Sequence, residues 1–154
     1  MRSKAILVCV ALAMLATTGL SQTNRASSAM EATDRASITG IWRAQMDGLP
    51  AITLTVTDEG GSLAGAVLFY LHRRDPGQSV TATPGVPEPL FNPRFDGKTL
   101  TFQVSHRRAH PPGSLHDGPV RFQLKLSGAD KGEFVNENEQ DPNAPVFVLK
   151  KSTY

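Results

Sequence analysis

The chain has almost no cysteine, and its one cysteine cannot crosslink a folded domain. Cys9 is the single cysteine among 154 residues, and it falls inside an apolar N-terminal run. Disulfides are therefore excluded as a source of stability for the rest of the chain, although exported proteins commonly contain them. With well over a hundred residues left, one hydrophobic core can supply the stability instead, and we expect a single domain.

Long apolar runs are also scarce. The N-terminal run covers residues 5–16 and follows two basic residues, Arg2 and Lys4. At 12 residues it is too short to span, as a helix, a bilayer core of roughly 30 Å. A basic start, a short apolar run and small residues are typical of a secretory signal peptide. We predict a signal peptide over 1–21, with an uncleaved anchor as the alternative. The rest is expected to be exported, periplasmic or extracellular, with no membrane span after cleavage.

An excess of either charge is missing as well. The chain has 16 Lys+Arg and 14 Asp+Glu. Arg2 and Lys4 leave with the signal peptide, so 14 basic residues face 14 acidic residues in what remains. Nucleic-acid binding requires a clear basic excess, so nucleic acid is excluded as a partner.

Motifs of catalysis and cofactor binding are absent too. There is no Gly-x-Ser-x-Gly, no phosphate loop and no dinucleotide fingerprint. The segment 106–117 has residue types of a metal site and of a hydrolase triad. Those residues are His106, His110, Ser114, His116 and Asp117. Against a metal site, Pro111-Pro112 prevents the helix that would align its histidines, and their spacing fits no zinc pattern. Against a triad, its members would all lie in one loop, whereas a triad needs them on different elements of a rigid frame. We predict no metal, no cofactor and no catalytic residues, and favour a binding protein over an enzyme.

What the sequence does contain is strict alternation of apolar and polar residues. In 51–57, Ile52, Leu54 and Val56 are interleaved with threonines, and 99–107 and 120–127 follow the same pattern. A period of two gives a strand one apolar and one polar face. Weaker patterns predict further strands at 40–46, 62–72, 89–95, 133–137 and 146–150.

These patterns predict an all-β fold. Roughly eight antiparallel strands in sequence order favour an up-and-down barrel, with a two-sheet β-sandwich as the alternative. Residues 22–37 are small and polar without a period, which predicts a flexible leader before a β-barrel domain at 38–154. All seven phenylalanines fall in predicted strands and are expected to supply most of the core. Pro93 indicates an edge or a bulge, and Asp96-Gly97 predicts a hairpin turn.

The first predicted strand opens with Gly40-Ile41-Trp42. This resembles the Gly-x-Trp start of the lipocalins and the wider calycin group. The resemblance implies a closed barrel in which Trp42 plugs one end and a basic residue near the last strand, Lys150 or Lys151, packs over it. It also implies an opposite mouth that admits a small apolar ligand. The overall pattern is similar to that of small uncharacterised exported bacterial proteins, which implies no function.

One tripeptide occurs twice, as His72-Arg73-Arg74 and as His106-Arg107-Arg108. Each follows a predicted strand, and alternate strands of a meander end at the same rim. Because arginine grips carboxylate or phosphate with two parallel hydrogen bonds, we expect an anion-binding mouth. Its candidate residues are Tyr70, His72, Arg73, Arg74, His106, Arg107 and Arg108. The alternative is that strand ends are charged because they are solvated, with Asp75, Glu137 and Glu139 neutralising the arginines.

Two functions therefore stay open. The first is a non-enzymatic exported barrel that binds a small apolar ligand, including a small organic anion or a lipid-like molecule. The second is a protein-interaction or inhibitor module that uses the 73–88 and 109–118 loops. A filled interior would favour the second, because an eight-stranded barrel is only just wide enough for its own side chains. The sequence gives neither the ligand nor the oligomeric state.

Overall fold

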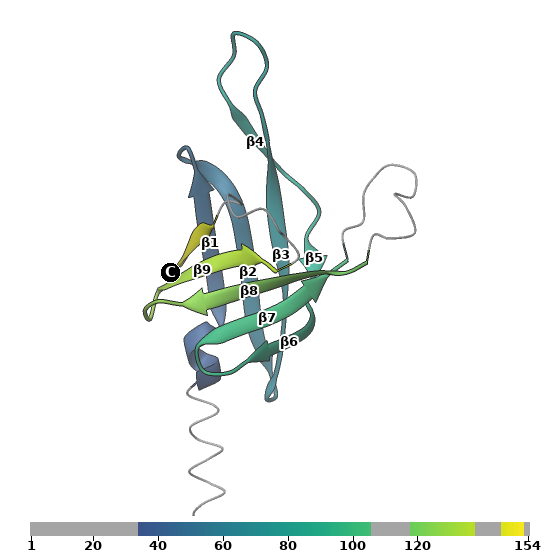
Figure 1. The fold of residues 1–154 in the computed structure, drawn as a ribbon, viewed down its shortest axis with the longest axis vertical. Coiled ribbons are helices and arrows are strands. Elements are labelled where there is room, and N and C mark those ends of the chain that lie inside the picture. The colour runs from purple at the N-terminus through teal and green to yellow at the C-terminus, as the bar shows by residue number, and fades with distance from the viewer. Residues whose placement is uncertain (1–33, 106–117, 138–145, 153–154) are drawn as a thin grey trace, which may run out of the picture.

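The computed structural model describes residues 34–105, 118–137 and 146–152. The described residues form ten strands (Figure 1). Their bounds are β1 Gly40–Met46, β2 Leu49–Glu59, β3 Ser62–Arg73, β4 Thr81–Pro84, β5 Glu88–Pro89, β6 Phe91–Phe95, β7 Thr99–Val104, β8 Val120–Leu126, β9 Lys131–Asn136 and β10 Phe147–Lys151.

The strands form one antiparallel sheet that curls into a half-barrel. The hydrogen-bonded order is β4-β3-β2-β1-β10-β9-β8-β7-β6, and β5 pairs with β3 off this path. The pairing of β1 with β10 joins the first and last strands of the chain. In Figure 1, β7, β8 and β9 run across the direction of β1, β2 and β3. The all-β antiparallel prediction is confirmed at this level.

Two elements differ from the sequence-based expectation. Residues 34–38 form a short helical turn, so the last four residues of the expected flexible leader, 34–37, are ordered. They have no apolar period, and contacts with the other end of the chain hold them in place. The second element is β4, which lies in the stretch 73–88 that was expected to be a loop without secondary structure.

The core lies in the concavity of the sheet and is entirely apolar among the described residues. Three rings form its centre: the Phe122 and Phe134 centroids are 5.1 Å apart, and those of Phe102 and Phe122 are 5.9 Å apart. The ring of Phe69 on β3 meets that of Phe122 on β8 across the interior, with their centroids 5.5 Å apart. All seven phenylalanines lie in strands as predicted, but Phe91 is 45% exposed and does not belong to this core.

The inner face of β3 is the one that carries Val67, which is fully buried. Gly65 lies on the same face, with φ +153°. A Cβ atom placed on Gly65 would lie 2.0 Å from the carbonyl oxygen of Thr55 on β2. The absence of a side chain at Gly65 therefore allows β2 and β3 to approach closely at this level.

Two predictions for the segment around β6 are confirmed, the irregularity at Pro93 and the hairpin turn at Asp96-Gly97. The register of β6 against β7 shifts between Phe91 and Arg94, as the proline at Pro93 indicated, and Asn92 takes φ +50°. In the following turn, Asp96 Oδ1 accepts hydrogen bonds from the amides of Lys98 at 2.9 Å and Thr99 at 2.7 Å. β6 is therefore a bulged strand that ends in a tight, side-chain-capped turn.

Candidate functional site

The β3–β4 hairpin projects beyond the rest of the sheet (Figure 1). The registered pairs of β3 with β2 end at Ile52 and Phe69, and the pairs of β3 with β4 begin at Tyr70 and Pro84. From that point β3 continues to Arg73 with β4 as its registered partner, while the ring of His72 still reaches β2. The extension also carries an apolar side chain in solvent, since Leu71 is 70% exposed. Val86, which follows β4 at the base of the hairpin, is 81% exposed.

The first His-Arg-Arg motif lies on this extension. His72 Nε2 is 2.8 Å from the carbonyl oxygen of Pro50 on β2, so this ring is anchored to the sheet. Arg73 Nε is 3.2 Å from Asp75 Oδ1 in an exposed ion pair, worth only about 0–1 kcal/mol. Arg74 is exposed and Tyr70 is half-buried. Asp75 thus engages one of the two arginines, as the alternative of neutralised strand ends anticipated.

The second motif, His106-Arg107-Arg108, and most of the 109–118 loop lie outside the described residues. The expected meeting of the two motifs at one rim therefore stays a prediction. The candidate metal and triad residues of segment 106–117 fall outside the described ranges too. Within the described ranges, no group of three His, Cys, Asp or Glu residues is arranged to hold a metal ion.

The opposite end of the molecule is closed around Trp42, which is fully buried. Its Nε1 donates a hydrogen bond to the carbonyl oxygen of Ile38 at 2.8 Å. Lys151 Nζ lies 5.5 Å from the centre of the Trp42 ring and donates to the carbonyl oxygens of Ala36 at 3.2 Å and Ser37 at 2.8 Å. Of the two lysines considered, Lys151 is the one over the ring. Its ammonium ties the last strand to the helical turn.

Burial lowers the pKa of Lys151 below its ordinary value of 10.5, because removing the ammonium from water disfavours its charged form. The two carbonyl oxygens and the indole ring are the groups that hold the ammonium in this position. Gly40 makes room for the lysine stem, since a Cβ there would lie 2.9 Å from Lys151 Cε.

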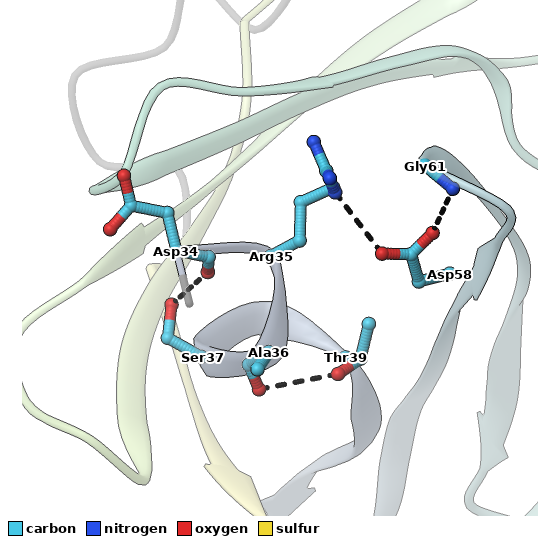
Figure 2. A network of polar contacts seen from close by, with 7 residues as sticks. All are labelled: Asp34, Arg35, Ala36, Ser37, Thr39, Asp58 and Gly61. Atoms are coloured by element: carbon cyan, nitrogen blue, oxygen red, sulfur yellow. Dashed lines mark hydrogen bonds and ion pairs between the residues drawn. The ribbon is translucent and has the colours of Figure 1, made fainter. Parts of the chain in front are cut away.

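A hollow of about 570 Å³ lies between the helical turn, the β2–β3 turn and the β6–β7 turn. Figure 2 shows the polar contacts on one side of it. Arg35 Nε is 3.1 Å from Asp58 Oδ2, and Asp58 Oδ1 accepts the amide of Gly61 at 2.7 Å. Asp96, on the opposite side, is held by the turn amides of Thr99 and Lys98, and these hydrogen bonds lower the pKa of its carboxyl group. The carboxylates of Asp58 and Asp96 therefore both accept hydrogen bonds from neighbouring residues of the protein.

A second hollow, of about 470 Å³, lies on the outer face of β6, β7 and β8. Arg94 borders both hollows. On the far side of the second hollow, Arg121 Nε is 3.4 Å from Glu137 Oε2, and Gln123 Nε2 donates to Glu137 Oε1. The sequence analysis predicted neither hollow, because segments distant in the chain form each of them. Pro93, at the bulge, was the one local signal.

Comparison of the chain with protein-family models, with curated proteins and with solved structures found no match in any of the three. Among the described residues, no helix has the length and apolar character needed to cross a bilayer. The class that the fold defines is therefore a curled, antiparallel all-β domain, and function has to be argued from its surfaces.

Proposed function

We propose that this protein is an exported β-barrel module that binds another protein through its β3–β4 hairpin. The observation that carries the proposal is the ordered β3–β4 hairpin, which continues past the last registered pair of β3 with β2 and projects beyond the rest of the sheet (Figure 1). Leu71 and Val86 expose apolar surface there, and Arg74 adds a cation without a described counter-charge. A partner with an apolar patch bordered by carboxylates complements this surface. Export rests on the reading of residues 1–21 as a signal peptide.

The proposed barrel closes through residues 88–95. β5 pairs with β3, β6 pairs with β7, and between them the amide of Leu90 donates to the carbonyl oxygen of Gly65 at 3.0 Å. Taken as one strand, β5 and β6 complete a ring of eight strands, to which the β4 hairpin is an addition. Closure leaves no long sheet edge free, which suits a protein that stays soluble. Slow hydrogen exchange at the Leu90 amide would support it, and exchange at the rate of an open loop would contradict it.

The ring contacts in the interior favour a protein partner over an interior ligand. The rings of Phe69, Phe102, Phe122 and Phe134 occupy the space between the two halves of the sheet, with neighbouring centroids 5.1–6.4 Å apart. A ligand in the barrel would have to displace them. A small apolar or lipid-like ligand is the second candidate, favoured by the wholly apolar lining among the described residues.

The test is capture of an exported partner by the purified protein. We expect a partner to bind the wild type and the control Val148→Ser, which removes a half-exposed apolar side chain from β10. Binding should be lost in Leu71→Ser and should weaken in Arg74→Glu. In the complex, hydrogen exchange should slow at the hairpin amides of residues 70–86. Capture that both hairpin variants retain would refute the proposal, and native mass spectrometry that finds a bound small molecule would favour the second candidate.

A further inference from the structure

We propose that the outer face of β6, β7 and β8 carries a second site, which binds an acidic oligosaccharide at the β6 bulge. The site is independent of the hairpin and of any protein partner there. Four features of different kinds meet at it: a strained residue, an exposed aromatic ring, polar side chains without partners and a hollow.

The strained residue is Asn92. It takes φ +50° in the middle of the register shift between Phe91 and Arg94. Asparagine tolerates this left-handed conformation better than most non-glycine residues, but glycine would adopt it at lower cost. Bulges of this kind redirect side chains and are common beside binding sites. Here the bulge places the carboxamide of Asn92 on the wall of the 470 Å³ hollow.

The register of the strands defines the rest of the site. Phe91, Gln103 and Arg121 form one cross-strand row, and Arg94, Thr101 and Gln123 form another. Because Phe102 and Val104 are buried in the core, Thr101 and Gln103 lie on the opposite, outer face of β7. The exposed ring of Phe91 therefore stands on the same face, at one end of the first row.

The polar groups are of two kinds. Arg121, Gln123 and Glu137 are linked to one another. By contrast, the side chains of Asn92, Arg94, Thr101 and Gln103 have no hydrogen bond or ion pair within the described ranges. Residues with two carboxamides, a hydroxyl and a guanidinium thus line one hollow, and none of these groups is bonded to another residue that the structure describes.

A sugar acid matches this combination. Its hydroxyl groups both donate and accept, as the carboxamides of Asn92 and Gln103 do. Its carboxylate complements the guanidinium of Arg94, which offers two parallel donors. The C–H face of a pyranose ring packs on an aromatic ring such as that of Phe91. An acidic peptide satisfies the charge but not the two carboxamides, and a lipid tail leaves the polar groups of Asn92, Thr101 and Gln103 unsatisfied.

The experiment is an NMR titration of the purified protein with trigalacturonate at millimolar concentration, with maltotriose and triglutamate as comparison probes. We expect trigalacturonate to shift the side-chain amide signals of Asn92 and Gln103. Arg94→Gln and Asn92→Gly should each weaken its binding about tenfold, the loss of one charge-assisted or paired hydrogen bond. Phe91→Ala should weaken it about fivefold.

The control is Lys125→Gln, which removes a charge from the same face of β8 at the rung of Thr99 and Glu133, away from the hollow. It should bind trigalacturonate like the wild type. Unchanged melting temperature in Asn92→Gly would show that its loss of binding is not a loss of fold. Unshifted signals with trigalacturonate would overturn the proposal. So would equal binding by wild type and Arg94→Gln, or binding of maltotriose or triglutamate as tight as that of the uronate.

Discussion

Replacement of Phe102 by alanine measures how far the ring cluster stabilises the fold. Phe102 is 1% exposed and touches the rings of both Phe122 and Phe134. Burial of about 150–250 Å² at about 25 cal/mol per Å² gives roughly 4–6 kcal/mol for the side chain. Alanine keeps part of this burial free energy, and the neighbouring side chains relax partly into the cavity left by the ring. The free energy of unfolding should therefore fall by about 3–5 kcal/mol.

Urea denaturation of Phe102→Ala and of the matched variant Phe91→Ala tests whether the ring cluster stabilises the fold. Phe91→Ala makes the same chemical change on the outer face, where the ring is already half in water, and should cost about 1 kcal/mol or less. The urea dependence should be the same in both variants, so that the midpoints report stability alone. Equal losses in the two variants, or a loss below about 1 kcal/mol for Phe102→Ala, would refute the view that the rings hold the sheet together.

Three further predictions concern the closed end, the β6–β7 turn and the β2–β3 contact. Lys151→Met removes the charged donor from the carbonyl oxygen of Ser37, and unfolding free energy should fall by about 1–3 kcal/mol, with faster hydrogen exchange in the helical turn. Asp96→Asn keeps an acceptor oxygen but removes a carboxyl whose pKa in the fold is lowered. In the wild type the ionised carboxylate accepts the turn amides and stabilises the folded state. This stabilisation is fully present above the ordinary pKa of 3.8 and is lost as pH falls through the lower pKa of the folded state. Thermal melts between about pH 5 and pH 2 should therefore depend less on pH in the variant. Gly65→Ala places a Cβ against the carbonyl oxygen of Thr55 and should cost about 2–4 kcal/mol in denaturant titrations.

Each of these predictions has a control or a contrary result. Lys150→Met changes the neighbouring exposed lysine and should be near neutral. If it matched Lys151→Met, the role of the helical turn would be wrong. If the melting temperature fell equally between about pH 5 and pH 2 in the wild type and in Asp96→Asn, the Asp96 carboxylate would not stabilise the β6–β7 turn. Gly48→Ala meets open space at φ +77° and should cost about 1–2 kcal/mol, so a larger loss there than at Gly65 would contradict the close approach of β2 and β3.

Strands with a regular apolar face were predictable, and elements that depend on distant contacts were not. β1 begins and ends where the sequence predicted, because its apolar positions face the core and Gly48 turns the chain after it. The helical turn at 34–38 has no such pattern. It is held by Trp42 and Lys151, which come from elsewhere in the chain. β4 escaped notice because two threonines, an alanine and a proline carry no apolar alternation.

The candidate sites divide in the same way. The resemblance to the lipocalins implied that Lys150 or Lys151 packs over Trp42, and Lys151 lies over its ring. The role of Trp42 as a plug of a closed barrel stays a prediction. No local pattern announces that Arg94 borders two hollows, because the walls come from six separate segments of the chain. The first His-Arg-Arg motif lies on the extension of β3, but the exposure of Leu71 there follows from the pairing of β3 with β4, which the sequence did not predict.

The closed end gathers both described termini of the domain. Lys151 binds the carbonyls of the turn at 36–37, and the amide of Ser152 donates to the carbonyl of Ile41 at 2.7 Å. In Figure 1 the helical turn and the β3–β4 hairpin lie at opposite extremes of the long axis. A purification tag or a surface anchor held on the side of the helical turn would therefore leave the hairpin directed outward. This is the orientation that a partner approaching from solution would meet.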